Sequence, residues 1–340
     1  MAGLPDVPGP KLMPFIPNGT PFELEFIKLL GSGEHGHVWK VSINGDIYAL
    51  KMFRFDDRFT PTRWWEVVLP KEDQRLWQFA FNCECRAYAR LKEVKKEFIA
   101  VPCYGYLILG EEHQKALRKK DKLNWKEDWG HSKKDRGQPL QALVKKFIEW
   151  QPVRNDDFEE GFNRRRIRLA IDSAATARKL IENMKILHRA GILCNDVNNS
   201  NVLNGQFLEF SSAFTAPHPC LSTKQIEARK CPFDSLGYWD ASAVDEMIED
   251  YNNVHTPSEY IWDRATPNEK YQAKLRSHQH PPGWKEGPWN WNRGYRFRPD
   301  KFRWENIGKT KEEDPVKTQE SSSKQEKHKK KGKRKAKSKG

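Results

Sequence analysis

The stretch LHRAGILCNDVNNSN, residues 187–201, does most to decide the fold of this chain. It begins inside a helix that apolar periodicity predicts over residues 163–190 and that Gly191 would end. Asp196 and Asn201 follow, five positions apart. Phosphoryl transfer uses such a pair, because the Asp accepts the proton of the attacking hydroxyl group and the Asn holds a magnesium ion. The pair alone is a weak signal, since any polar turn can contain it.

A glycine-rich loop near the start of the chain is the second feature. The sequence GSGEHGHV, residues 31–38, fits the pattern G-x-G-x-x-G-x-V, whose backbone N–H groups can approach phosphates. The residues expected to cover a nucleotide are Gly31, Gly33, Gly36 and Val38. Strand patterns lie on both sides of the loop, and Asn44-Gly45 predicts a hairpin into a third strand. This context argues against a dinucleotide-binding fold, in which the glycines open a helix.

Lys51 lies on the apolar face of that third strand. A lysine there needs an anion, because burying its charge alone is unfavourable; the alternative is an edge-strand lysine that opposes aggregation. A helix predicted over residues 76–91 places Glu84 beside its buried face, where it could reach Lys51. Glu72, Glu93 and an unrelated surface role for Glu84 remain alternatives. His188 is expected to pack beneath the Asp196 loop and not to act as a base.

These features follow the order found in eukaryotic protein kinases, which the chain resembles from about residue 22 to residue 215. Residues 48–53, 82–93 and 100–107 are also similar to a fungal kinase-like family that includes inner-kinetochore subunits of the Fta type. The resemblance implies an α+β, bilobal kinase-like fold, with a small antiparallel β lobe and an abbreviated, mainly helical lobe. The expected segments are a flexible lead-in at 1–21, a kinase-like domain at 22–308 divided into lobes at 22–148 and 149–308, and a disordered basic tail at 309–340.

The same resemblance implies an ATP- and Mg²⁺-dependent protein kinase acting on Ser or Thr hydroxyl groups. Lys51 would hold phosphates, Glu84 would orient Lys51, and Asp196 would be the catalytic base. Asn201 and Glu209 would hold magnesium, because a second Asn-Gly turn brings Glu209 back to the catalytic loop. Backbone groups near Phe147 and Ile148 would bind adenine.

Three departures weaken the catalytic interpretation. Cys194-Asn195-Asp196 stands for the His-Arg-Asp of kinases, Asn198 for a lysine, and Glu209-Phe210-Ser211 for Asp-Phe-Gly. Glu in place of Asp moves a carboxylate by roughly 1–1.5 Å, and misplacement by about 1 Å can lower a rate about 100-fold. The alternative is a pseudokinase that acts as a nuclear scaffold or a kinetochore-complex subunit.

Composition sets the remaining expectations. The 340 residues carry a net charge of +14, and residues 324–340 alone hold ten Lys or Arg and one Glu. Such a tail indicates nuclear import or contact with DNA or chromatin, or only improves solubility. The six cysteines lack zinc spacing and no long apolar run is present, so we expect a nuclear, and also cytoplasmic, protein without a membrane anchor. The Trp- and Arg-rich stretch 284–304 could stack nucleic acid, pack on the core or bind a protein.

Overall fold

A computed structural model of the chain describes residues 3–18, 22–55, 70–149, 169–221, 240, 243–244, 246–248 and 250–251. All of them belong to one unit of the chain, Met1–Ile307. The expectations for the Trp-rich stretch 284–304 and for the tail 309–340 lie outside these residues. Within this described part, no helix is both long enough and apolar enough to cross a membrane.

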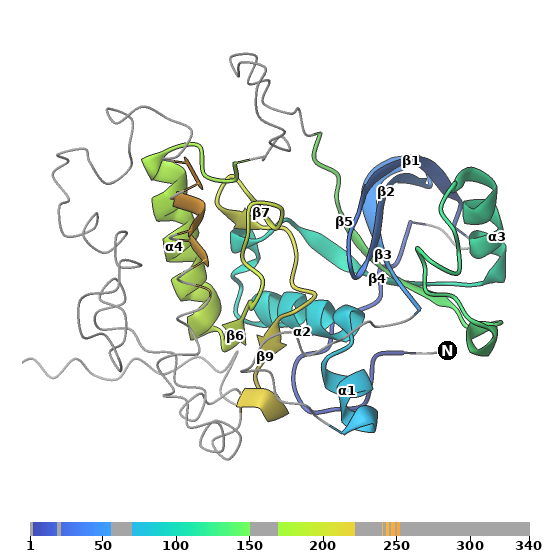
Figure 1. Ribbon diagram of the computed structural model, residues 1–340, viewed down its shortest axis with the longest axis horizontal. Coiled ribbons are helices and arrows are strands. Elements are labelled where there is room, and N and C mark those ends of the chain that lie inside the picture. Colours follow the sequence, from blue (N-terminus) through green and yellow to red (C-terminus); the bar gives the residue numbers. More distant parts are fainter. Residues whose placement is uncertain are drawn as a thin grey trace, which may run out of the picture. The chain divides into compact units, whose positions relative to one another are not determined.

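A five-stranded antiparallel sheet forms the first half of the fold, with the strand order β1-β2-β3-β5-β4 (Figure 1). The strands are β1 (Leu24–Ser32), β2 (Gly36–Ile43), β3 (Asp46–Phe53), β4 (Cys103–Leu109) and β5 (Leu140–Lys146). The predicted hairpin between β2 and β3 is confirmed, since Asn44 and Gly45 both have positive φ, at 50° and 90°. The mixed α+β class and the antiparallel sheet are likewise confirmed.

The helix predicted over residues 76–91 is broken in the structure. A first helix, α1 (Lys71–Trp77), ends before Phe79, whose extended backbone precedes α2 (Ala80–Glu93). The side chain of Asn82 donates to the carbonyl oxygens at the end of α1, at 3.0 Å to Arg75 and 3.3 Å to Leu76. These contacts satisfy groups that a helix end leaves without partners, so the break is stabilised locally.

The helix predicted over residues 163–190 begins later than expected. It is α4 (Ala174–Arg189), and the described residues before it, 169–173, are not helical. Ser173 is the N-cap, because its hydroxyl accepts a hydrogen bond from the backbone N–H of Thr176 at 3.2 Å. The predicted stop is confirmed, since Gly191 has φ of 74° just after the helix.

Two apolar clusters cover the two faces of the sheet. On one face α2 packs against residues that include Phe53 and Leu143. On the other face lies an insertion between β4 and β5, which contains α3 (Glu111–Lys120) and packs Leu117 and Trp129 onto the sheet (Figure 1). The remaining short elements are β6 (Ile192–Leu193), β7 (Val202–Leu203), β8 (Gln206–Phe207), β9 (Phe214–Thr215) and 3-10 turns at Glu97–Ile99, Lys133–Asp135 and Pro219–Leu221.

Residues 3–18 pack against this fold, where a flexible lead-in was expected. Leu12 is only 2% exposed, and the backbone N–H of Phe15 donates to the carbonyl of Tyr106 in β4 at 2.8 Å. Gly105 permits this approach, because a Cβ atom there would lie 2.6 Å from the backbone nitrogen of Phe15. The segment therefore covers the outer edge of β4.

Two buried arginines fasten α2 to distant backbone. Arg86 donates to the carbonyl oxygens of Pro8 at 2.9 Å, Thr215 at 3.1 Å and Pro217 at 2.6 Å. Arg90 donates to those of Ala216 at 2.7 Å and Ala190 at 3.4 Å. The helix thus joins the N-terminal segment to the backbone around β9.

Candidate functional site

The structure brings Lys51 and Glu84 together in its interior. Lys51 comes from β3, opposite Val38 of β2, and Glu84 comes from α2. The Lys51 Nζ lies 2.8 Å from the Glu84 Oε2, and the two side chains are 6% and 0% exposed. The alternative partner Glu93 instead contacts Arg90 at 3.1 Å.

Lys145 is a member of this site that the sequence did not reveal. It lies opposite Ala49 in the β3–β5 register, and so on the same face of the sheet as Lys51. Its Nζ donates to the Glu84 Oε1 and, at 2.8 Å, to the carbonyl oxygen of Leu208. One buried carboxylate therefore receives two lysines.

The β7–β8 hairpin supplies the second carboxylate. As predicted, Asn204 and Gly205 form its turn, with φ of 49° and 73°. The strand leads directly to Glu209, whose Oε1 lies 2.9 Å from the Lys51 Nζ. Ser211 completes the group, because its hydroxyl accepts from Lys51 at 2.6 Å and donates to Glu84 at 3.0 Å.

We call Lys51, Glu84, Lys145 and Glu209 the ion cluster. Two positive and two negative groups give it a formal charge of zero. Burial alone would raise the pKa of Glu84, but Lys145 and Lys51 outweigh burial and hold this pKa below its ordinary value. Burial likewise opposes ionisation of Glu209, yet Lys51, assisted by the Ser211 hydroxyl, lowers its pKa to about 2. Both carboxylates are therefore ionised at neutral pH, and each lies against the Nζ atom of at least one lysine.

The loop after β6 places Asp196 and Asn201 in contact. The Asn201 Nδ2 donates to the Asp196 backbone carbonyl at 3.0 Å and to its Oδ2 at 2.8 Å. Asn198 donates to the Asp196 Oδ1 at 2.9 Å. The backbone carbonyl of Asn201 also accepts a hydrogen bond from the backbone N–H of Leu208 at 2.8 Å, and this bond joins the loop to the segment that carries Glu209.

Asp240 supports this loop from far along the chain, and no motif in the sequence predicted its role. Its carboxylate accepts from the backbone N–H groups of Cys194 and Asn195, both at 2.8 Å. It also lies 2.9 Å from the His188 Nε2 at the end of α4. Asn195 has φ of 65°, a conformation that these bonds stabilise. His188 is thus placed beneath the loop, in a structural position.

The glycine loop contains residues with different environments. Gly36 is required by packing, because a Cβ atom there would lie 2.1 Å from the carbonyl oxygen of Met52. Gly31 is exposed in β1, and Gly33 is exposed in the turn, where its N–H donates to the Gly36 carbonyl at 2.9 Å. At the tip of the loop, the His35 Nε2 lies 3.5 Å from the hydroxyl of Ser212, which is three residues after Glu209 of the ion cluster.

Phe147 and Ile148, expected near adenine, follow the end of β5 and are half-buried. The Nζ of Lys40 lies 4.4 Å from the centre of the Phe147 ring, a cation–π contact. No described hydrogen bond or ion pair joins these two residues to the ion cluster.

Asn201 and Glu209 carry the oxygen atoms that Mg²⁺ prefers. In the structure, however, the Glu209 carboxylate is bound to Lys51 and the Asn201 amide nitrogen to Asp196. Among the described residues, no group of three or more His, Cys, Asp or Glu side chains could hold a metal ion. Each of the two expected magnesium ligands therefore has a partner within the chain.

The fold and site define an α+β protein whose sheet and polar loops meet at a buried, charge-balanced cluster. Residues 1–214 match the family described as Kinetochore Sim4 complex subunit FTA2, and the chain belongs to this family. The predicted similarity to Fta-type kinetochore subunits is confirmed, whereas the wider relation to protein kinases stays a prediction. No curated protein matches the chain.

Proposed function

We propose that this chain is a structural subunit of a nuclear kinetochore complex, which binds other subunits and does not transfer phosphate. Membership of the Sim4 complex subunit family supports the kinetochore role. The observation that carries the non-catalytic part is the engagement of Lys51 by Glu84 at 2.8 Å, Glu209 at 2.9 Å and Ser211 at 2.6 Å.

This engagement opposes nucleotide binding for an electrostatic reason. A phosphate group that approached Lys51 would compete with the Glu209 carboxylate, which carries the same sign of charge. Lys145 cannot replace Lys51, because it is already shared between Glu84 and the Leu208 carbonyl. Breaking such a buried pair leaves an uncompensated charge, which costs about 3–5 kcal/mol.

A kinase-like, bilobal ancestry would account for the order of the features in the chain. The antiparallel sheet, the Lys51–Glu84 pair and the Asp196–Asn201 loop are consistent with it. In this proposal the protein has kept a kinase-like scaffold and replaced nucleotide contacts by internal ion pairs.

The second candidate is an ATP- and Mg²⁺-dependent Ser/Thr protein kinase. Two observations favour it: the 2.8 Å Lys51–Glu84 pair and the contact between Asn201 and Asp196. Here Asp196 would accept the substrate proton, while Asn201 and Glu209 would have to exchange their present partners for magnesium.

Thermal unfolding of the full chain with ATP, with and without Mg²⁺, separates the candidates. A ligand at about 100 times its Kd adds about 2.7 kcal/mol to the free energy of unfolding. We expect no magnesium-dependent rise in Tm, and we expect Asp196→Asn to assemble with its complex like the wild type. A magnesium-dependent rise that Lys51→Ala and Glu209→Ala each lose, relative to their own ligand-free Tm, would refute the non-catalytic proposal.

The basic tail belongs to the nuclear part of the proposal. Deleting residues 309–340 removes its Lys- and Arg-rich run and should weaken nuclear entry or chromatin association more than Asp196→Asn does. Fluorescence microscopy of tagged chains measures this. Identical distributions of both variants and the wild type would contradict it.

A further inference from the structure

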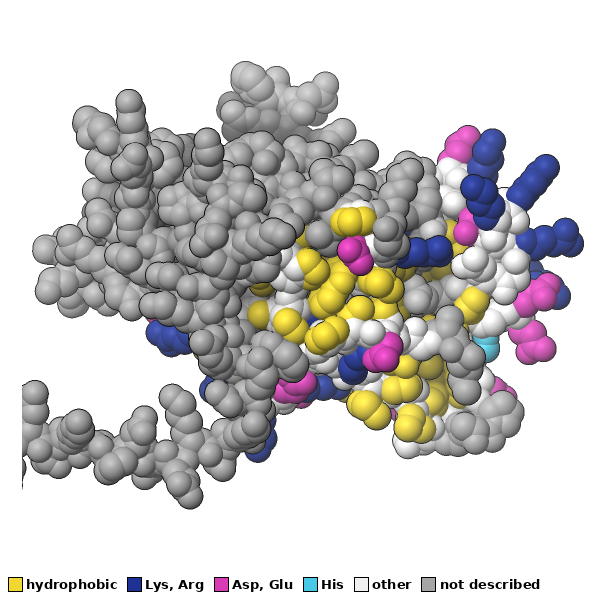
Figure 2. Space-filling view, turned by 90° about the horizontal axis from the view of Figure 1, so that it is seen from below, with side chains coloured by type: hydrophobic (Ala, Val, Ile, Leu, Met, Phe, Trp, Pro, Cys, Tyr) yellow, Lys and Arg dark blue, Asp and Glu magenta, His cyan; other side chains and the backbone are white. Residues whose placement is uncertain are grey.

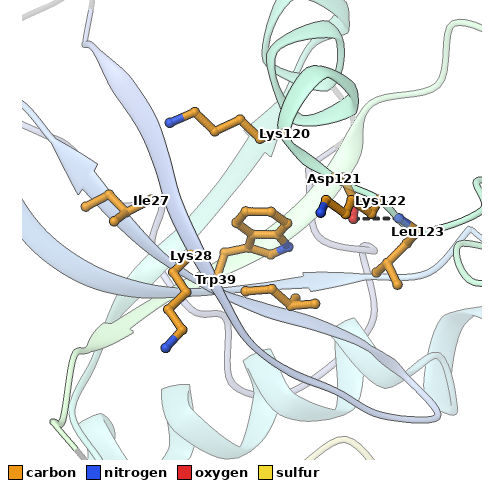
Figure 3. Close-up of a pocket in the computed structure, with 8 residues that line it drawn as sticks. Ile27, Lys28, Trp39, Lys120, Asp121, Lys122 and Leu123 are labelled. Atoms are coloured by element: carbon orange, nitrogen blue, oxygen red, sulfur yellow. Dashed lines mark hydrogen bonds between the residues drawn. The ribbon is translucent and has the colours of Figure 1, made fainter.

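A hollow of about 250 Å³ lies between the edge strand β1 and the segment that follows α3 (Figure 3). Trp39 is at its centre and is 4% exposed, with Ile27 and Lys28 of β1 on one side. Lys120 and Lys122 border it from the insertion. We call it the lysine hollow. It is smaller than the roughly 300–1,000 Å³ of most small-molecule pockets, and so suits a side chain of a peptide better than a cofactor.

The edge strand beside the hollow is irregular in an informative way. The pairing of β1 with β2 shifts between Phe26 and Lys28 and again between Leu29 and Gly31. The extra residues of these two bulges are Ile27 and Leu30, and they are 40% and 44% exposed. Bulges redirect side chains at sheet edges. Here they present apolar side chains outward on a strand whose outer edge is not paired with any described strand.

The rim of the hollow is positively charged. Lys28 and Lys122 are exposed and form no ion pair within the described part of the chain, while Lys120 contacts Glu25 at 3.4 Å. The one acidic lining residue, Asp121, uses its oxygens internally, accepting from the Leu123 N–H at 3.0 Å and from the Trp129 indole at 2.7 Å.

The basic character extends over the insertion. Residues 115–126 hold six Lys or Arg and one Asp. In Figure 2, lysine and arginine side chains, with acidic side chains among them, gather at the end of the view where Figure 1 places α3, while apolar side chains gather nearer the middle. The Trp39 indole nitrogen adds a buried donor that has no acceptor among the described residues.

We propose that the lysine hollow binds an acidic segment of a partner protein, with one apolar side chain in the hollow and carboxylates against Lys28, Lys120 and Lys122. Charge complementarity selects an acidic partner, and the exposed edge of β1 suits an extended peptide. Nucleic acid fits less well, because Trp39 is buried and offers no face on which a base could stack. The inference rests on the proposed function only in taking the partner to be another subunit of the complex.

The test measures fluorescence anisotropy of a labelled peptide, Asp-Glu-Glu-Phe-Glu-Asp-Glu, with the purified full chain at about 0.15 M salt. The double variant Lys28→Glu/Lys122→Glu reverses two rim charges. Its matched control is Lys133→Glu/Lys134→Glu, which makes the same charge change at two exposed lysines of the same insertion, away from the hollow. We expect the rim variant to bind about tenfold more weakly, equivalent to about 1.4 kcal/mol, and the control to stay within about twofold of the wild type.

Two further peptides and a DNA duplex make the result specific. Replacing Phe by Gly, or the acidic residues by Gln and Asn, should weaken binding about tenfold or more. Equal losses in the rim and control variants, or equal binding of the neutral peptide, would overturn the proposal. So would a short DNA duplex that displaces the peptide at the same concentration as unlabelled peptide does. These outcomes do not depend on ATP, so they are distinct from failure of the non-catalytic proposal.

Discussion

Lys145 donates to the buried carboxylate of Glu84 from the strand next to the one that carries Lys51. Two lysines thus meet one carboxylate, and Glu209 balances the second positive charge from the β7–β8 hairpin. The cluster joins the sheet, α2 and the segment that follows β8. Its members should therefore depend on one another energetically.

Replacing Lys145 tests whether the second lysine stabilises the fold. Lys145→Met leaves the Glu84 carboxylate with one cation in a buried site, and breaking a buried pair costs about 3–5 kcal/mol. Lys146→Met is the matched control, because Lys146 is the adjacent, exposed residue and should change stability by less than about 0.5 kcal/mol. Urea unfolding measures both. Equal effects of the two substitutions would show that Lys145 contributes only its packing.

A double-mutant cycle tests the coupling of Lys51 and Glu209. Each single substitution, Lys51→Met or Glu209→Gln, should lower the free energy of unfolding. The sum of the two losses should exceed the loss in the double variant by about 1–3 kcal/mol, because the double variant leaves Glu84 and Lys145 as a neutral pair. The exposed pair Lys115–Glu111, 3.0 Å apart, is the control, and its coupling should be much weaker because solvent screens both charges. Additive effects at Lys51 and Glu209 would contradict the cluster.

The pH dependence of stability should reveal Glu209. Its pKa falls from an ordinary 4.5 to about 2 in the folded protein, because Lys51 outweighs the opposing effect of burial. The resulting stabilisation is fully present above pH 4.5 and is lost as the pH falls from there toward 2. The Glu209→Gln variant lacks this stabilisation. The difference in free energy of unfolding between the wild type and this variant should therefore shrink by about 1–3 kcal/mol as the pH falls from 4.5 toward 2, a range that allows for solvent screening of a side chain that is 28% exposed. Chemical denaturation at a series of pH values measures this deficit, and a constant deficit would contradict the assignment.

Asp240→Asn should loosen the Asp196 loop. The substitution removes the charge that receives the backbone N–H groups of Cys194 and Asn195, and a buried donor left without an acceptor costs about 1–3 kcal/mol. Hydrogen exchange of those two amides should accelerate. Asp46→Asn, at the exposed first residue of β3, serves as the control. Unchanged exchange in Asp240→Asn would show that the loop holds its shape without this carboxylate.

Local signals in the sequence were sufficient for the hairpins. Asn44-Gly45 and Asn204-Gly205 need positive φ at both positions, and few other residue pairs accept it. The need of Lys51 for an anionic partner could also be predicted, because a charge on an apolar strand face requires one. Helical periodicity placed Glu84 beside the buried face of its helix, with Glu72 and Glu93 as alternatives, even though the helix that carries it begins only at Ala80.

Contacts between residues far apart in the chain could not be predicted from the sequence. Lys145 enters the site through the register of β3 with β5, two strands separated in the sequence by α1, α2, β4 and the insertion. Asp240 contacts residues more than forty positions earlier, and no local sequence pattern predicts these contacts. Gly36 matched a phosphate-binding pattern, yet the carbonyl of Met52 already explains why it lacks a side chain. Spacing therefore revealed candidate residues, while the tertiary packing determined their partners.

The two arginines of α2 also have a mechanical consequence. Arg86 holds the carbonyl of Pro8 with one guanidinium nitrogen and those of Thr215 and Pro217 with another, while Arg90 holds Ala216 and Ala190. A pull on residues 3–18 must rupture the Arg86 bond to Pro8 before that end can peel away. Force applied to residues 3–18 is therefore transmitted through Arg86 to α2 and to the backbone around β9. A partner attached to this N-terminal segment would pull on these buried elements together.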